Sequence, residues 1–289
     1  MRRFSVRLFS FLVILISLSA ALLPAAGSCE TVLRGYEEDG GYVYVLLGQY
    51  PQTAEGEVQP ILWRVLASDS EKCILLSEYI LFARCINASL TEYRDEIKGD
   101  LGKTDLCEYL NIVFASDAFS EDDLSLLLPM EGVGRIFIPS AEDLQNKAYG
   151  LGVTVKGVKS SKKILSNPGL RAWGTEWAVK NNGYNPVEYP NPRQKVTGSS
   201  KKEMPVKELR LFVYSAGWAS HSPYWTRDAS AADPRQARDI KASGSIGRLE
   251  VGRDNVGVRP MIWLAQGGFD TVSGAGTKED PWVIVRKGE

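Results

Sequence analysis

Alternating apolar and polar residues predict short β-strands in two separate parts of the chain. The first group lies near the N-terminal end, at 42–53 (YVYVLLGQYPQT), 61–68 (ILWRVLAS) and 72–81 (KCILLSEYIL). The second group lies near the other end, at 209–215 (LRLFVYS), 223–230 (PYWTRDAS), 244–252 (GSIGRLEVG) and 256–264 (VGVRPMIWL). We expect the strands of the two groups to meet in one sheet, so that N- and C-terminal strands pair.

Between the two groups, the spacing of polar residues predicts short capped helices. Three pairs have the spacing of a capping box, namely Asp105 with Glu108, Ser120 with Asp123, and Ser140 with Asp143. A strand at 135–140 precedes the third pair, and 175–183 (TEWAVKNNG) predicts one more helix. The order of strands, helices, strand and helix predicts an α+β fold and argues against a parallel βαβ sheet.

Changes in composition suggest the domain boundaries. The stretch at about 184–208 is rich in Pro, Asn, Lys and Ser, which is typical of a loop-rich insertion. We therefore expect a single mixed domain at 40–266 that contains this insertion. A linker at 29–39 precedes it, and a tail at 267–289 with room for a strand follows it.

The first 28 residues have the pattern of an export signal. Basic residues at the start of the chain precede an apolar segment at 8–23, and small residues follow at 25–28. The apolar segment is shorter than the roughly 20 residues of a spanning helix, which argues against an uncleaved anchor. Cys29 comes directly after Ala-Gly-Ser, as in a bacterial lipobox, although Ala26 stands where that motif usually has leucine. We expect an extracytoplasmic protein that is secreted, periplasmic or anchored through a lipid on Cys29.

The cysteines leave two arrangements open. If Cys29 carries lipid, then Cys73, Cys85 and Cys107 remain and one of them is unpaired. If it does not, the four cysteines could form two disulfides in any of three connectivities. The sequence contains no Cys-x-x-Cys motif and a single histidine, His221, so we predict neither a metal site nor a cofactor.

Composition argues against a nucleic-acid partner. The chain has 289 residues, of which 44% are hydrophobic and 24% charged, and its formal net charge is −1. Such a chain can bury a core. Binding to nucleic acid requires a concentration of basic residues, which these values do not indicate. We therefore expect no nucleic-acid partner, and contact with a membrane only through a lipid at the N-terminus.

Seven strings resemble, in their order along the chain, a bacterial family of exported domains of unknown function, DUF6273. They are GQYPQT (48–53), PILWRVL (60–66), ILLSEYIL (74–81), YLNIVFASDAFSEDD (109–123), RIFIPSAEDL (135–144), YWTRD (224–228) and GVRPMIWL (257–264). The resemblance covers about 40–266 and implies a fold like that of C-type lectins and formylglycine-generating enzymes. In such a fold the terminal strands pair and a long irregular region presents ligands. The sequence departs from the family in its proline-rich insertion and in YWTRDAS, where relatives usually have Trp followed by Leu-Arg-Ser.

Two arginines interrupt apolar strands, Arg64 beside Trp63 and Arg259 four residues before Trp263. An unpaired charge inside a domain is costly, so each arginine should have a partner. We expect each guanidinium to bind a carboxylate or main-chain carbonyls while its stem packs on Trp63 or Trp263. This structural role is favoured over ligand binding. Pro260 cannot donate a ladder hydrogen bond and should lie at an edge or a bulge.

No catalytic residues are predicted. A Ser-His-Asp triad could be imagined from His221 with Asp228 or Asp233, but closeness in sequence does not establish that geometry. The sequence has no Gly-x-Ser-x-Gly motif. The copper-binding cysteines that formylglycine-generating enzymes carry late in the chain have no counterpart after Cys107.

A binding surface is the remaining prediction, centred on the segment from Tyr224 to Asn255. Its candidate ligand-binding residues combine aromatic planes with charged and amide groups, which suits sugars or peptides. These residues are Tyr224, Trp225, Arg227, Asp228, Arg253 and Asn255. Core burial of Trp225 is the favoured alternative for that residue. We expect a non-catalytic module that binds a glycan, a cell-wall polymer or a protein, with an extracytoplasmic hydrolase as the alternative.

Overall fold

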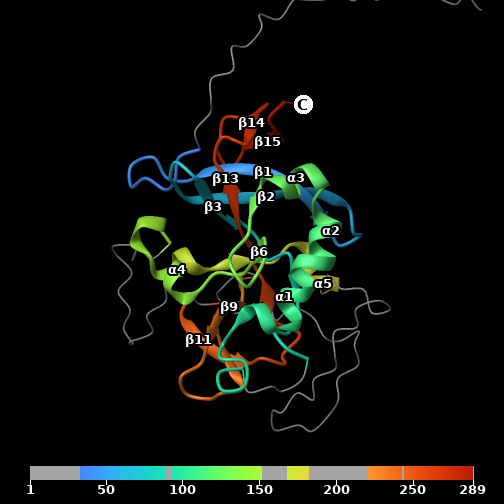
Figure 1. Ribbon diagram of the computed structural model, residues 1–289, viewed down its shortest axis with the longest axis vertical. Coiled ribbons are helices and arrows are strands. Elements are labelled where there is room, and N and C mark those ends of the chain that lie inside the picture. Colours follow the sequence, from blue (N-terminus) through green and yellow to red (C-terminus); the bar gives the residue numbers. More distant parts are fainter. Residues whose placement is uncertain (1–32, 89–92, 152–167, 182–220, 243, 289) are drawn as a thin grey trace, which may run out of the picture. The chain divides into compact units, whose positions relative to one another are not determined.

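The structure is a computed structural model that describes residues 33–88, 93–151, 168–181, 221–242 and 244–288 (Figure 1). All of these residues lie within one unit, Thr31–Glu289. Several predictions lie outside the described residues: the export signal, the lipidation of Cys29, the insertion at 184–208 and the strand at 209–215.

The larger sheet has eight strands, in the order β14-β15-β1-β2-β3-β13-β5, with β6 also paired to β13. Their bounds are β1 Val43–Pro51, β2 Val58–Ser68, β3 Lys72–Ser77, β5 Leu127–Leu128, β6 Ile136–Phe137, β13 Met261–Ala265, β14 Phe269–Thr271 and β15 Trp282–Arg286. In β1, buried and partly exposed residues alternate from Val43 to Leu47, as predicted for a strand with one face on the core. β1 pairs with β15 in parallel and with β2 antiparallel, so strands from both ends of the described chain meet.

The second sheet has five strands, in the order β11-β10-β9-β12-β4. Their bounds are β4 Phe82–Ala83, β9 Tyr224–Ala229, β10 Gln236–Ile240, β11 Ile246–Glu250 and β12 Gly257–Val258, and a separate pair joins β7 Ala172–Trp173 to β8 His221–Ser222. The sequence did not predict β10. Its buried residues are Ala237, Asp239 and Ile240, and the buried aspartate breaks the apolar alternation that marks a strand.

The segment 256–264 was predicted to be one strand, and this is wrong. β12 belongs to the second sheet and β13 to the first, and Arg259 and Pro260 form the passage between the two sheets. The chain makes the same passage between β3 and β4, and the two crossings are joined by a hydrogen bond from Ser77 N to Pro260 O of 2.9 Å. Proline lies where the ladder ends because it has no N–H to donate.

Short helices cover parts of this framework, and α2 contacts β1 while α3 contacts β15 (Figure 1). The helices are α1 Asp105–Tyr109, α2 Ala115–Ala118, α3 Glu121–Leu126, α4 Ala141–Gln145 and α5 Glu176–Asn181, with 3₁₀ turns η1 Leu101–Lys103, η3 Lys147–Tyr149 and η4 Pro168–Leu170 and a π-helical turn η2 Leu110–Phe114. The capping boxes at Ser120 and Ser140 are confirmed. The one predicted at Asp105 is wrong, since Thr104 caps α1 and Asp105 accepts a hydrogen bond from Ala88 N at 2.6 Å.

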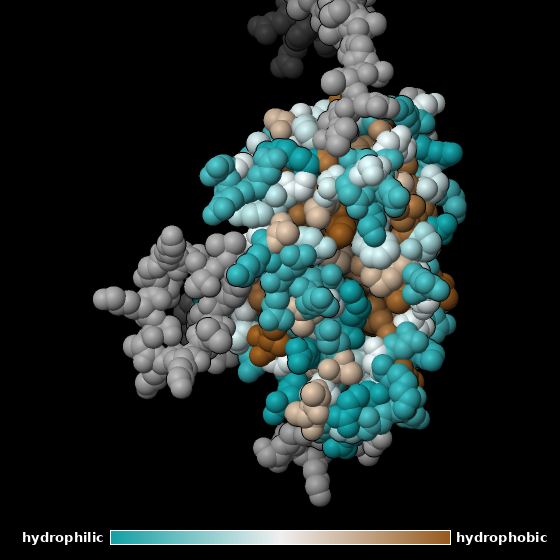
Figure 2. All heavy atoms as spheres, turned by 60° about the vertical axis from the view of Figure 1, so that its left-hand side comes forward, coloured by the Kyte–Doolittle hydropathy of each residue, from teal (hydrophilic) through white to brown (hydrophobic). Residues whose placement is uncertain are grey.

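The predicted α+β class is confirmed, because short, mostly antiparallel strands combine with a few helices in one unit. Aromatic and aliphatic side chains from both sheets and from the helices form a single buried cluster. On the face drawn in Figure 2, hydrophilic residues cover much of the surface and apolar residues gather in small groups. The tail after residue 266 contributes β14 and β15 to the larger sheet and is therefore part of the fold.

Cys73, Cys85 and Cys107 are buried thiols and form no disulfide with one another. Burial raises the pKa of all three thiols, that of Cys85 to about 12.

A Cys29→Ser variant tests the state of these three thiols with Ellman's reagent. We expect no rapid reaction in the native protein, because only the thiolate reacts and burial disfavours it. In denaturant without reductant, we expect three reactive thiols. Rapid labelling of the native protein, or fewer than three thiols after unfolding, would contradict this expectation.

Candidate functional site

Four charged residues gather where the chain passes between the two sheets, and we call them the junction cluster: Arg64, Glu78, Arg259 and Lys278. Arg64 Nε donates to Glu78 Oε2 at 2.9 Å, and Lys278 Nζ donates to Glu78 Oε1 at 2.7 Å. Arg259 is 1% exposed, and its Nε donates to the main-chain oxygen of Ser77 at 2.7 Å. Both arginines therefore have the partners that the sequence analysis required.

The electrostatics of the junction cluster centre on Glu78. Burial alone would raise the pKa of Glu78, but Arg64, Arg259 and Lys278 together hold that pKa below its ordinary value. The carboxylate of Glu78 is thus the shared counter-charge of three cations. Arg259 Nη1 is buried and has no hydrogen-bond partner among the described residues. The cluster joins β2, the β3–β4 crossing and the β12–β13 crossing, an arrangement that agrees with the structural role expected for the two arginines.

The aromatic partners of the two arginines differ from the expected tryptophans. The Arg64 guanidinium lies 4.5 Å from the ring centre of Tyr42, and that of Arg259 lies 5.5 Å from the ring centre of Tyr224. Trp63 is fully buried and donates its Nε1 hydrogen to Leu47 O at 2.8 Å. Neighbours along a strand point to opposite faces, which separates the Arg64 and Trp63 side chains. The ring of Trp263 instead packs against Lys72, whose Nζ lies 3.7 Å from the ring centre.

Four of the six predicted ligand-binding residues hold the fold together. Tyr224 and Trp225 are fully buried, and their polar atoms donate to Leu170 O and Arg84 O, both at 2.8 Å. These rings therefore belong to the core and offer no platform to a ligand. This is the alternative that the sequence analysis favoured for Trp225.

Arg227 and Asp228 both bind groups of helix α4. Arg227 Nη1 lies 2.8 Å from Asp143 Oδ2 and donates to Ile138 O at 3.0 Å. Asp228 Oδ2 accepts a hydrogen bond of 2.6 Å from Ala141 N, the first residue of α4. The two charged groups attach α4 to β9, so they are not available as a pair for a ligand.

The other two predicted residues, Arg253 and Asn255, line a hollow on one face of the second sheet, which we call the Asp239 pocket. Its volume is about 250 Å³, and its lining residues are Pro223, Asp239, Lys241, Ala242, Leu249, Arg253, Asn255 and Val256. Its walls are mostly apolar, with a few polar groups converging from β10 and from the loop after β11. This combination is common in sites for small ligands.

Asp239 is the unusual group of this pocket. It is 1% exposed, and its Oδ1 has no hydrogen-bond partner among the described residues. Burial raises the pKa of Asp239 to about 6, although Lys241 and Arg253 partly oppose this. Arg253 Nε is likewise buried and without a partner in the described part of the chain. Two residues that line the same small pocket thus carry an unsatisfied buried acceptor and an unsatisfied buried donor, which lowers the stability of the fold.

The glycine opposite Asp239 makes room for this arrangement. Gly247 pairs with Asp239 across the β10–β11 ladder. A Cβ atom at Gly247 would lie 2.6 Å from Asp239 Oδ1 and 2.5 Å from Lys241 Cε. The carboxylate and the lysine stem thus lie together over the glycine. Neither Asp239 nor Lys241 was predicted as a site residue. The signal in the sequence was an aspartate and a lysine two positions apart, with a glycine opposite the aspartate in the hairpin.

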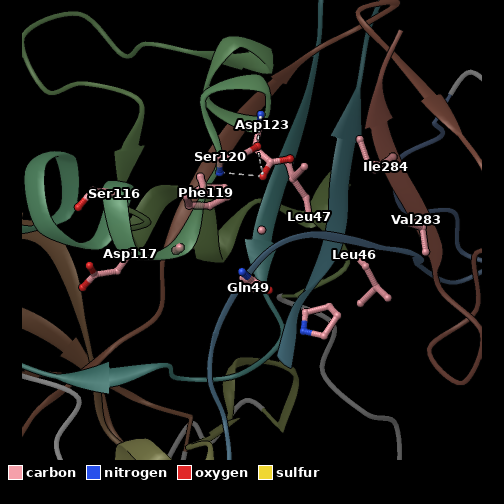
Figure 3. Close-up of a pocket in the computed structure, with 13 residues that line it drawn as sticks. Leu46, Leu47, Gln49, Ser116, Asp117, Phe119, Ser120, Asp123, Val283 and Ile284 are labelled. Carbon is pink, nitrogen blue, oxygen red and sulfur yellow. Dashed lines mark hydrogen bonds between the residues drawn. The ribbon is translucent and has the colours of Figure 1, made fainter. Parts of the chain in front are cut away.

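A larger hollow lies between β1, β15 and the α2–α3 turn (Figure 3). Its volume is about 450 Å³. Ser120 and Asp123 lie in its wall, but the Asp123 carboxylate already accepts hydrogen bonds from Ser120 N and Ser120 Oγ, at 3.0 and 2.8 Å. This carboxylate is engaged in capping α3, so the hollow is a weaker candidate than the Asp239 pocket.

Other kinds of site find no support in the described part of the chain. There, no three His, Cys, Asp or Glu side chains come together as a metal site would require. No described helix combines the length and apolar character of a membrane span. The side chain of His221, considered above for a triad, is not described. Comparison with protein-family models, with curated proteins and with solved structures found no match to this chain.

Proposed function

We propose that the chain is an exported, non-catalytic binding module whose Asp239 pocket takes a hydroxyl-rich group, such as one sugar unit of a glycan or cell-wall polymer. The observation that carries this is the pair of buried polar atoms, Asp239 Oδ1 and Arg253 Nε, that lack partners within the described residues. A hydroxyl group can accept from one of them and donate to the other. Apolar walls beside such polar groups suit the mixed surface of a sugar ring.

Access to the carboxylate involves Lys241. The lysine stem and Asp239 Oδ1 both lie over Gly247, and Lys241 is exposed at its other end. A long side chain of this kind changes rotamer easily, so an entering ligand could move it aside and reach Oδ1. The unmet hydrogen bonds of the free pocket would then be formed in the complex.

The resemblance to the DUF6273 family, the export pattern of the leader and the α+β architecture support the rest of the proposal. Pairing of β1 with β15 fits a C-type-lectin-like arrangement, in which terminal strands meet. We propose this fold relationship, and a secreted, periplasmic or lipid-anchored location, together with the binding function.

Asp239→Asn tests the pocket and its electrostatics together. A carboxyl group with a raised pKa binds its proton more tightly in the folded state than in the unfolded state, so stability falls as pH rises from about 4 to 6. Asparagine has no charge to bury. We expect Asp239→Asn to be about 1–3 kcal/mol more stable than the wild type at pH 7.5, and to lose this advantage at pH 4.

Binding is measured on a glycan array with the purified protein, with Asp39→Asn as a control that removes an exposed aspartate. We expect wild-type protein and the control to bind the same glycans, and Asp239→Asn and Arg253→Gln to bind them at least about tenfold more weakly. Glycan binding that survives both substitutions would remove this pocket from consideration.

The raised pKa of Asp239 also favours the alternative, a hydrolase, because a carboxyl group that keeps its proton near neutral pH can act as a general acid. Mass spectrometry of bound glycans after long incubation separates the two functions. Intact glycans support the binding module, whereas cleavage by the wild type and not by Asp239→Asn would replace it with the enzyme.

A further inference from the structure

A second hollow lies beside the β10–β11 hairpin, and we call it the Arg238 hollow. Its volume is about 620 Å³, and its lining residues are Ser230, Ala231, Ala232, Arg238, Lys241, Ile246, Gly247 and Arg248. Alternate residues of a strand point to opposite faces, so Arg238 and Asp239 serve different sides of the sheet. Three of the eight lining residues are basic and none is acidic.

The two arginines are direct neighbours across the ladder. Arg238 on β10 pairs with Arg248 on β11 in the antiparallel register, which places both side chains on one face. Like charges in directly opposite positions destabilise a hairpin. β11 is moreover the outermost strand of the sheet.

No ion pair offsets this repulsion within the described residues. Neither Arg238 nor Arg248 forms any of the ion pairs found there, whereas Arg94, Arg227 and Arg235 each have an aspartate partner. Asp239, next to Arg238 in sequence, is buried on the other face. Glu250 lies on the same face as Arg248, two residues further along β11, but is not among the residues that line the hollow. The hairpin thus gathers two arginines and Lys241 around one hollow, without an ion-pair partner for either arginine within the described residues.

We propose that the Arg238 hollow binds the anionic groups, phosphate or carboxylate, of an extracellular polymer. Guanidinium groups bind both kinds of anion with two parallel hydrogen bonds. A hollow of this volume admits a repeating unit of such a polymer. The proposal goes beyond sugar binding in the Asp239 pocket and does not depend on it, although Lys241 lies at the rim of both hollows.

The test measures affinity for two soluble polymers, poly(glycerol phosphate) and polygalacturonate, at low and at physiological salt. We expect binding to at least one of them, weaker at higher salt because exposed charges are screened. Arg238→Gln and Arg248→Gln should each weaken binding by about fivefold or more. The polymer that binds more tightly identifies phosphate or carboxylate as the preferred anion.

Arg286→Gln is the matched control, because it removes an equal charge from the larger sheet, where Arg286 pairs with Asp122. Its affinity should equal that of the wild type. The thermal midpoint provides the second readout. Arg248→Glu places opposite charges across the ladder, so we expect it to raise the midpoint by about 1–2 °C while it abolishes binding.

Three results would overturn the proposal: no binding of either polymer, equal losses in Arg248→Gln and Arg286→Gln, or tighter binding to a DNA oligonucleotide than to both polymers. The neutral glycans of the array report on the Asp239 pocket separately. Failure at one hollow can therefore be distinguished from failure at the other.

Discussion

Glu78→Gln is expected to lower the free energy of unfolding by about 3–5 kcal/mol, because it leaves Arg64, Arg259 and Lys278 together without a counter-charge. The Glu78 side chain is 7% exposed and that of Arg64 is 15% exposed, so solvent offsets little of the loss at these two groups. Urea melts at pH 7.5 measure it. Glu37→Gln is the control, since Glu37 pairs with Arg34 on the exposed surface and should change stability by less than about 0.5 kcal/mol.

The loss at Glu78 should depend on pH in a defined direction. The pKa of Glu78 is lowered in the folded state, so its contribution is complete above the ordinary glutamate pKa and disappears as pH falls through the lower, folded value. Wild-type and variant midpoints should therefore converge in acid.

Arg259→Met is a companion variant with a smaller expected loss of about 2 kcal/mol. It leaves Ser77 O without its donor, but it also removes the buried Arg259 Nη1, which has no partner among the described residues. Midpoints equal to the wild type in both Glu78→Gln and Arg259→Met would show that the junction cluster does not hold the sheets together.

Trp225→Ala is expected to cost about 3–5 kcal/mol, because the fully buried indole leaves a cavity in the second sheet and Arg84 O loses its donor. Trp225→Phe keeps most of the ring and should cost about 1–2 kcal/mol. Thermal melts measure both losses. A Trp225→Ala variant with wild-type stability and impaired glycan binding would contradict the core assignment and restore Trp225 as a ligand platform.

Elements that depend on near neighbours in sequence were predictable. The alternation in β1, β2 and β3 identified those strands, and a serine followed three residues later by an aspartate identified the starts of α3 and α4. A cap is made by atoms within one helical turn, so its signature is contained in four residues. At the start of α1, Thr104 and Asp105 are both polar residues that could act as the N-cap. Because Asp105 is engaged with Ala88 N in the folded chain, Thr104 caps the helix.

The candidate site was predictable only in part. The segment from Tyr224 to Asn255 was the right region, but composition cannot tell which side of a strand faces the core. Tyr224 and Trp225 are buried, whereas Arg253 and Asn255 reach the Asp239 pocket. The basic Arg238 hollow was also hidden, because a formal net charge of −1 averages over a chain in which Arg238 and Arg248 meet through strand register.

By itself, the sequence determined the α+β class, the first three strands, two of the capped starts and the need for partners at Arg64 and Arg259. These follow from local periodicity, from hydrogen bonds within a turn and from the cost of burying an unpaired charge. Only the tertiary structure decided that Arg259 and Pro260 carry the chain from one sheet to the other. Only the tertiary structure made Glu78 the shared partner of Arg64, Arg259 and Lys278. Only it showed that Asp239 is a buried carboxylate. The reason is that these outcomes depend on residues as much as 200 positions apart, such as Lys278 and Glu78, which only the folded chain brings within hydrogen-bond distance.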